Sequence, residues 1–259
     1  MGAFLLLFLC LLTTTSTNQE TCPGGTGHGN TILTNETCSG SDGQTGVIIL
    51  ITTNQIRVCF NLDTHQTIYT EHIVGRTIDS YLLYHSISSV NIDRGHLVPP
   101  CDFNTTEQQS DTYFYINAAP IVHDLYSGGW SQVEQQVRDL MNKHLDLTTH
   151  VLSTTYGTQC LVQGRLAVPT HFVKILTDIH DKEDSSMVVG DNSMNFSSAV
   201  ILPDCEVETC VWMTSSYPRV YCCVVRPELM ERLNLSVSLA SKSAKKTTKR
   251  LFTSSDNKD

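Results

Sequence analysis

The sequence has no apolar run long enough to cross a membrane. A helix needs about 20 apolar residues to span the ~30 Å hydrocarbon core of a bilayer, and the apolar run at residues 4–12 is far shorter. Thr- and Ser-rich sequence follows this run, an arrangement typical of a signal peptide, although no Lys or Arg precedes it. We therefore expect residues 1–17 to be a cleaved signal peptide and the protein to be secreted. The alternative is a buried N-terminal helix.

Basic residues are also scarce. The chain has 17 Lys and Arg against 26 Asp and Glu, a net charge of −9. Six of the basic residues lie in residues 238–259, a Ser-, Lys- and Thr-rich segment that we expect to be disordered, either as a solvated tail or as a tether to polyanions. The acidic remainder counts against tight non-specific binding to nucleic acid, because that binding comes largely from neutralising phosphates. A nucleic-acid site would need a local basic patch.

The cysteines lack the paired short spacings of a zinc site. Only Cys205/Cys210 and the adjacent Cys222-Cys223 come near such a spacing. Removal of Cys10 with the signal peptide leaves nine cysteines. In an oxidising compartment most of them should pair, with one left over. Four Asn-X-Ser/Thr sequons agree with export if the host glycosylates proteins; they lie at Asn35, Asn104, Asn195 and Asn234.

The remaining pattern predicts one α+β domain, which we place at residues 18–237. The apolar residues between Trp130 and Met141 recur with a period near 3.6, which predicts one amphipathic helix. Residues 19–45, rich in Gly, Thr and Ser, are expected to form a loop held by Cys22 and Cys38. The expected strands are 47–51 and 56–60, as a hairpin, then 66–74, 112–116, 147–153, 168–179, 199–202 and 206–213.

The residues with chemical potential gather in one stretch. Asp93-Arg94-Gly95-His96 supplies an imidazole that can act as a general base near neutral pH and a guanidinium that suits phosphate. Asn117 follows the expected strand at 112–116, and its amide could lie beside a hydrated metal. The four-residue string alone is weak, because a His after Gly is usually a surface or core residue.

Further segments follow in a compact order. They are Asn117-X-Ala-Pro at 117–120, Trp130-X-X-X-Glu134 with Arg138, and Val-Pro-X-X-Phe-X-Lys at 168–174. Together with the Asp-Arg-Gly-His string, they resemble the DNA/RNA non-specific endonuclease family, the secreted and mitochondrial nucleases with a ββα-metal core. The resemblance covers roughly residues 45–215 and implies a central antiparallel sheet with a core helix. Within it, we expect Trp130 and the 168–174 strand to serve mainly packing.

The resemblance also implies a mechanism for phosphodiester hydrolysis. His96 would take a proton from the water that attacks phosphorus, and Arg94 would hold a non-bridging oxygen. A hydrated Mg²⁺ (or Mn²⁺) would offset charge on the leaving 3′ oxygen, so that cleavage leaves a 5′-phosphate and a 3′-hydroxyl. Glu134 would hold metal-bound waters, or else pair with Arg138 on the same helix face. Asn117 would either order the site or simply turn the chain.

One residue that the resemblance implies is missing. In the family a single Asn on the core helix contacts the metal, and the matching position here is Tyr126. A neutral phenol is a poor ligand for Mg²⁺, and the Gln that usually follows Ala-Pro is Ile121 here. Either a local change of register brings Asp124 or His123 to the metal, or the site binds metal weakly. The carboxylate of Asp124 is chemically the better substitute, because Mg²⁺ prefers hard oxygen ligands.

Two functions remain open from the sequence. The first is a secreted, metal-dependent endonuclease that cuts DNA and RNA without sequence preference by contacting backbone phosphates. The second is a catalytically impaired protein that keeps the fold and binds nucleic acid or another partner. Arg94 and His96 favour the enzyme, whereas Tyr126 and the acidic body favour the impaired protein. No membrane partner is expected, and the sequence does not define an oligomeric state.

Overall fold

The computed structural model describes residues 31–40, 44–51, 56–75, 92–144, 148–162, 166–180, 185–194, 200–233 and 235. The expected signal peptide, the basic tail and Cys22 lie outside these residues. Within them, no helix combines the length and apolar character needed to cross a membrane.

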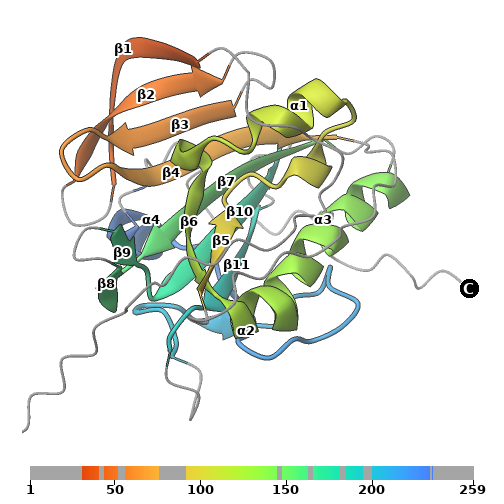
Figure 1. Ribbon diagram of the computed structural model, residues 1–259. Coiled ribbons are helices and arrows are strands. Elements are labelled where there is room, and N and C mark those ends of the chain that lie inside the picture. The colour runs from red at the N-terminus through yellow and green to blue at the C-terminus, as the bar shows by residue number, and fades with distance from the viewer. Residues whose placement is uncertain are drawn as a thin grey trace, which may run out of the picture.

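A nine-stranded antiparallel sheet forms the body of the protein (Figure 1). Its strand order is β1-β2-β3-β4-β7-β10-β11-β13-β12, so the sheet is built mainly from strands that neighbour one another in sequence. The strands are β1 Thr31–Ser39, β2 Thr45–Ile51, β3 Ile56–Asn61, β4 Gln66–Val74, β7 Thr149–Tyr156, β10 His171–Asp178, β11 Ser185–Asp191, β12 Val207–Glu208 and β13 Val220–Cys223. Two small ribbons stand apart from this sheet, β5 Ile92–His96 with β6 Ala118–Val122 and β8 Cys160–Val162 with β9 Leu166–Val168.

One long helix packs against the sheet. The segments α2 (His123–Leu125) and α3 (Ser131–Lys143) are joined by a π-helical turn, Tyr126–Trp130, so the helix runs without a break from His123 to Lys143. The predicted amphipathic helix is therefore confirmed, although it begins earlier than its apolar stripe. The shorter helices are α1 Thr106–Asp111 and α4 Pro227–Arg232. The α+β class and the antiparallel sheet with a core helix are confirmed.

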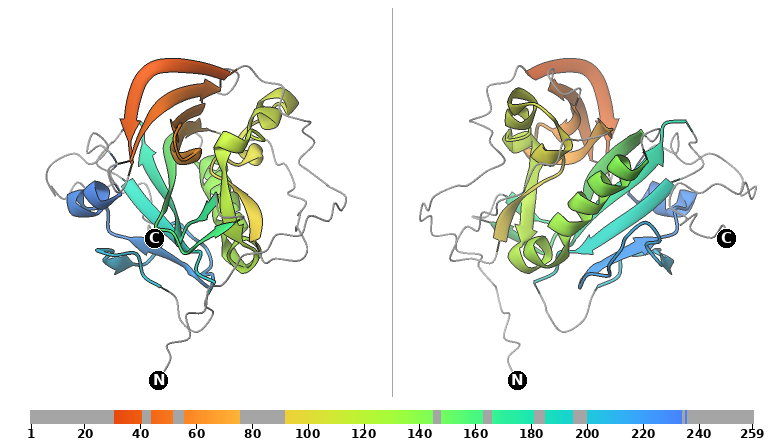
Figure 2. Two further views of the ribbon diagram at one scale, coloured as in Figure 1. Left: turned by 60° about the vertical axis from the view of Figure 1, so that its left-hand side comes forward. Right: turned by 90° about the vertical axis from the view of Figure 1, so that its right-hand side faces the viewer.

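The sheet is buried on both faces, and β10 shows how. Its side chains alternate, so Phe172 and Leu176 join the core beneath α3, whereas Val173 and Ile175 join the core beneath α4. Figure 2 shows α3 and α4 on opposite sides of the sheet. A strand covered on both faces reads as a continuous apolar run, which explains why 168–179 was recognisable from the sequence.

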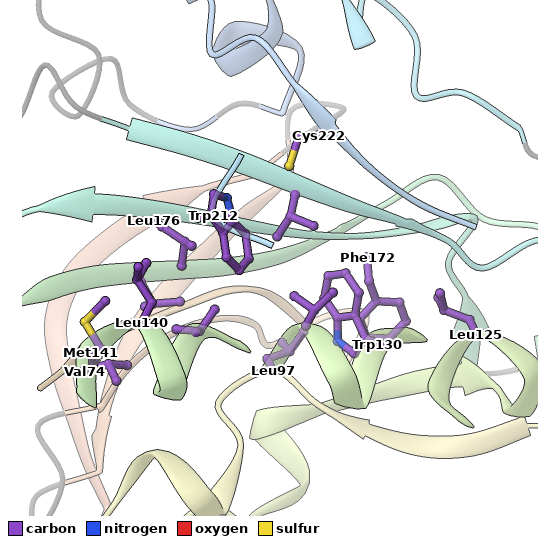
Figure 3. Packing of buried hydrophobic residues seen from close by; sticks show 14 of the residues in the cluster. Val74, Leu97, Leu125, Trp130, Leu140, Met141, Phe172, Leu176, Trp212 and Cys222 are labelled. Atoms are coloured by element: carbon purple, nitrogen blue, oxygen red, sulfur yellow. The ribbon is translucent and has the colours of Figure 1, made fainter. Parts of the chain in front are cut away.

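Trp130 forms the centre of the core beneath α3 (Figure 3). Its ring meets Phe172 at 5.8 Å between centroids and an interplanar angle of 63°, and only 1% of its surface is exposed. Gly190 on β11 makes room for this ring, because a Cβ there would lie 2.8 Å from the Trp130 Cε3 atom. Trp130 is therefore a packing residue that fixes the distance between the helix and the sheet.

The expected strand at 112–116 is wrong. After α1 the chain turns and forms a short 3-10 helix, Tyr115–Asn117. Thr112 caps the C-terminus of α1, where its hydroxyl donates to the Gln109 carbonyl, and its own carbonyl accepts from the side chain of Asn117. These local hydrogen bonds replace the ladder that a strand would need, so aromatic and β-branched composition gave the wrong answer.

The ends of the sheet also differ from expectation. Residues 31–39, expected as loop, form edge strand β1, which the Cys38–Cys59 disulfide ties to β3. Residues 200–202 form no strand, and of 206–213 only Val207–Glu208 pairs. Disulfides hold that segment instead, through Cys205–Cys223 and Cys210–Cys222. Cys101 is also disulfide-bonded, and Cys160 takes part in none of the three described bridges.

Candidate active site

The Asp-Arg-Gly-His string forms strand β5, which pairs with β6 so that Arg94 lies opposite Pro120 and His96 opposite Ala118. Gly95 allows this ribbon to lie close to the main sheet, because a Cβ there would come within 3.1 Å of Ile121 and Phe172. Successive side chains of a strand point to opposite faces. Arg94 and His96 therefore share one face of β5.

Asp93 serves the other face of the strand. Its carboxylate lies 2.7 Å from Nδ1 of His123, at the start of the long helix. The Asp93 side chain is nearly buried, whereas about a third of His123 is exposed. Asp93 thus fastens β5 to α2, and it does so from the side opposite to His96.

His96 has the properties of a neutral general base. Its ring is partly buried, stands edge-on to Tyr113 at 5.2 Å between centroids, and carries an Nε2 atom that is buried without a hydrogen-bond partner among the described residues. Burial lowers the pKa of His96 to about 4, and the charges of Arg94 and Lys174 add to this effect. The imidazole is therefore unprotonated at neutral pH and able to accept a proton.

Arg94 supplies the exposed positive charge beside this histidine. Its guanidinium lies 4.5 Å from the centroid of the Tyr115 ring, a cation–π arrangement. Tyr115 is itself 78% exposed and Arg94 is exposed too, so the contact supports the arginine without covering it. Arg94 remains open to an anion.

Asn117 is fully buried and clamps the loop that follows His96. Its amide nitrogen donates to the carbonyls of Val98 and Thr112, each at 2.8 Å, and its side-chain oxygen accepts from the Val98 N–H at 2.9 Å. The backbone adds a fourth bond, from the Leu97 N–H to the Asn117 carbonyl at 2.9 Å. Every polar group of this side chain is engaged with backbone, so Asn117 joins the segment after His96 to the end of α1.

Lys174 extends from β10 to the backbone of the residue that follows His96. Its ammonium group donates to the carbonyl of Leu97 at 2.7 Å and to the hydroxyl of Ser153 at 3.0 Å. Only 2% of the Lys174 surface is exposed. Burial lowers the pKa of Lys174, which the negative charges of Glu134 and Asp102 partly oppose. Through Leu97 this lysine fixes the backbone next to the imidazole.

Glu134 lies one helical turn beyond Trp130 and is 5% exposed. Burial raises the pKa of Glu134 to about 7, against the positive charges of Lys174 and Arg138, which lower it. A carboxyl group in this state changes its charge near neutral pH. That is unusual for a glutamate and typical of residues at functional sites.

Arg138 lies deeper, in a buried network. Its guanidinium donates to Asp102 at 3.2 Å and to Gln135 at 2.9 Å, and Asp102 also receives Nε2 of His72 at 2.9 Å. Although burial opposes it, the hydrogen bond from His72 and the charge of Arg138 lower the pKa of Asp102. Arg138 is 2% exposed, so its guanidinium holds the helix to the loop after β5 rather than reaching solvent.

Comparison with known proteins identifies the family. The model of the DNA/RNA non-specific endonuclease family matches residues 60–209. The chain belongs to the DNA/RNA non-specific endonuclease family. The match includes β5, β6, the long helix and β10, and therefore every residue of the site described above.

Several relatives are similar over part of their length. A salivary endonuclease of Lutzomyia longipalpis is 30% identical over 39% of this chain and 27% of its own. Nuclease C1 of Cunninghamella echinulata var. echinulata is 31% identical over 47% of this chain and 49% of its own. Human mitochondrial endonuclease G is 28% identical over 39% of this chain and 40% of its own. The chain thus spans no more than half the length of these relatives.

A crystal structure of the EndoG/EndoGI complex is also similar, with a TM-score of 0.40 and 16% identity over 56% of this chain and 75% of that one.

The metal position implied by the family departs from its pattern. Tyr126 opens the π-helical turn, and its ring packs, partly buried, against the core beneath α3. Ile121 is fully buried, and Asp124 is exposed on α2. In the described ranges, no three His, Cys, Asp or Glu side chains gather as metal ligands. The phenol of Tyr126, packed on the core, does not replace the amide oxygen that the family places beside Mg²⁺, and the carboxylate of Asp124 points into solvent, so these residues do not fit the metal position of the family.

Three of the predicted residues, His96, Glu134 and Arg138, thus lie within the electrostatic reach of Lys174. Its positive charge lowers the pKa values of His96 and Glu134, and the charge of Arg138 lowers the pKa of Lys174 itself. Arg94 acts on His96 from the exposed side. Asp124 and Tyr126 lie in other surroundings, one in solvent and one against the core.

Sequence reasoning missed three parts of this centre. Lys174 was expected to serve strand packing. It lies two residues from both Phe172 and Leu176, however, so its side chain points to the same face of β10, the face beneath α3. His72 occupies an inward position of β4, between the buried Thr70 and Val74, and a polar residue in such a pattern is an indication that could have been used. Asp102 follows a Pro-Pro-Cys string that carries no such indication.

Proposed function

We propose that the protein is a secreted endonuclease that hydrolyses phosphodiester bonds of DNA and RNA without sequence preference. The observation that carries the proposal is His96, a neutral imidazole whose buried Nε2 has no partner in the part of the chain that the structure describes, on the same strand face as the exposed cation Arg94. Buried nitrogens of His72 and Trp130 also have no partner among the described residues, but His96 differs from them in lying on one strand face with an exposed cation.

The chemistry follows from these two side chains. A water molecule attacks phosphorus, and His96 accepts the proton that this water loses. Arg94 holds a non-bridging phosphate oxygen, whose negative charge grows in the transition state. The bond to the 3′ oxygen breaks, and that oxygen takes a proton from solvent, which leaves a 3′-hydroxyl and a 5′-phosphate. The groups that bind the substrate contact phosphate, which every nucleotide has, so no base preference results.

A test of this function compares the wild type with His96→Ala on plasmid DNA and total RNA. Loss of the general base should lower turnover by at least ~10²-fold. His144→Ala, which removes an exposed imidazole at the end of α3, is the matched control and should cleave like the wild type. Equal cleavage by His96→Ala and the wild type would exclude His96 from the reaction.

The same assay examines pH and metal dependence. Because burial lowers the pKa of His96 to about 4, the acidic limb of kcat/KM that reports this base should lie near pH 4 rather than near 6.5. Digestion with Mg²⁺, Mn²⁺ or EDTA tests the metal requirement that the family implies. Activity that survives EDTA would support hydrolysis by the side chains alone, and activity restored by Mg²⁺ would show a metal site that Tyr126 does not prevent.

Secretion is part of the proposal. Its supports are the disulfides Cys38–Cys59, Cys205–Cys223 and Cys210–Cys222 and the likeness to a salivary endonuclease, although mitochondrial nucleases are also among the relatives. We further propose the boundaries expected from the sequence, a signal peptide at 1–17, a nuclease domain at 18–237 and a basic tail at 238–259. The mass of the secreted protein would test the first of these boundaries.

One observation favours a second function, a nuclease fold that binds nucleic acid without cutting it. At the position where the family has the Asn that contacts the metal, this chain has Tyr126, which packs on the core. Such a protein would retain Arg94 as a phosphate contact. In a gel-shift assay, this second function would be favoured if the protein retarded a labelled oligonucleotide and did not cleave it with Mg²⁺, with Mn²⁺ or with EDTA.

A further inference from the structure

A pocket opens beside Arg94, and the nearly buried Asp93 also contributes to its lining. Its volume is about 480 Å³, which lies within the range of small-molecule sites, roughly 300–1,000 Å³. The walls come from the start of β4, from β5 and β6, from the end of β7 and from β9. Two of its lining residues, Arg94 and Tyr115, are the cation and the ring of the cation–π pair.

The position of Tyr115 is unusual for an aromatic residue. Tyr115 is 78% exposed, more than any other large apolar residue among those described. The ring belongs to the 3-10 helix that ends at Asn117, and Asn117 is clamped by buried hydrogen bonds. A rigidly mounted ring that faces solvent has a free face on which another planar group can stack.

The lining of the pocket matches a nucleoside. Apolar surface comes from Ile68, Ala119 and Pro120, which suits the faces of a base or the carbons of a sugar. Side-chain amides of Gln44 and Gln66 also line it. Each amide carries both donors and acceptors, so it can meet the edge of any base.

We propose that this pocket binds one unpaired nucleoside next to the scissile phosphate, with the base stacked on Tyr115. The proposal rests on the proposed function. It makes single-stranded nucleic acid, RNA or DNA, the preferred substrate class, because a base inside a duplex is stacked and paired and must be released before it can enter. Stacking suits an enzyme without sequence preference, since every base has a π-face.

The experiment compares Tyr115→Ala with Tyr115→Phe on one oligonucleotide, single-stranded and as a duplex. Loss of the ring should raise KM for the single strand by roughly 5- to 150-fold, the range that stacking of one base provides. Its effect on the duplex should be several-fold smaller, and kcat should change little. Tyr115→Phe keeps the stacking face and should behave like the wild type, as should Val211→Ala, which removes an exposed apolar side chain that does not line the pocket.

A binding measurement separates this proposal from the catalytic one. Fluorescence anisotropy of a labelled single strand, measured on His96→Ala protein with and without Tyr115→Ala, reports the pocket without any cleavage. Weaker binding on loss of the ring would support the pocket even if the wild type cut nothing. The nucleoside site would be overturned by unchanged Kd and KM, by equal losses on single strand and duplex, or by a fall in kcat alone, which would mean that Tyr115 only orients Arg94.

Discussion

The buried carboxyl of Glu134 gives a prediction with a definite sign. Burial raises its pKa from 4.5 to about 7, so between these two pH values the folded protein retains a proton that the unfolded chain has lost. The free energy of unfolding therefore falls as pH rises through this window, and the loss is complete above pH 7. Each pKa unit is worth 1.36 kcal/mol, which makes the cost of the ionised carboxylate about 3 kcal/mol.

Replacement of Glu134 by Gln removes this titration. The amide fits the same space and never ionises, so Glu134→Gln should gain about 3 kcal/mol relative to the wild type between pH 4 and pH 8. Any fixed cost of the buried amide is the same at both pH values and cancels in this difference. The opposite contribution of His96, whose lowered pKa removes stability as pH falls from 6.5 to about 4, is present in both proteins and cancels too.

The assay is urea unfolding of the oxidised protein, followed by circular dichroism at pH 4 and pH 8. Glu208→Gln is the control, because Glu208 is exposed on the edge strand β12 and its loss should change stability equally at both pH values. A stability difference for Glu134→Gln that varies by less than about 1 kcal/mol between pH 4 and pH 8 would contradict the burial of this carboxyl.

Three further predictions concern the clamp, the metal position and the cysteines. Asn117→Ala leaves three buried backbone groups without partners, and at about 1 kcal/mol each it should lower the free energy of unfolding by roughly 3 kcal/mol. A loss below about 1 kcal/mol in the same urea assay would contradict the hydrogen bonds assigned to Asn117. Tyr126→Asn should raise Mg²⁺-dependent cleavage of plasmid DNA, whereas no gain, together with an inactive Asp124→Ala, would favour the carboxylate as ligand. Unfolded, oxidised, secreted protein should show at most one thiol by Ellman titration, and several thiols would contradict the disulfide-linked form.

Much of the fold could be predicted from the sequence where the hydrophobic pattern of a segment alone determines its secondary structure. The strand at 66–74 and the hairpin partners at 47–51 and 56–60 were recognisable because their patterns match the pleat of a sheet. The helix was recognisable because its stripe faces a single core. In each case the residues of the segment are enough to decide its structure.

Other elements depend on partners far away in the chain. Residues 112–116 have strand composition, but the Thr112 hydroxyl donates to the Gln109 carbonyl, and the Thr112 carbonyl accepts from the side chain of Asn117. Residues 185–191 form a central strand, although their Ser, Met, Gly and Asp content carried no strong strand pattern. The site shows the same division, because the Asp-Arg-Gly-His string pointed to His96 and Arg94, whereas the pairing of Arg138 with Asp102 depends on tertiary packing.

The adjacent cysteines Cys222 and Cys223 point to opposite faces of β13, one into each core, and they hold Cys210 and Cys205 there. The segment between Cys205 and Cys210 is thereby tied to both faces of the sheet at β13. Exchange of the two neighbours would require the strand to turn over, which would move its buried side chains to the wrong layer. Oxidative maturation must therefore choose between two sulfurs one residue apart, and we expect a disulfide isomerase to speed recovery of the native form after reduction.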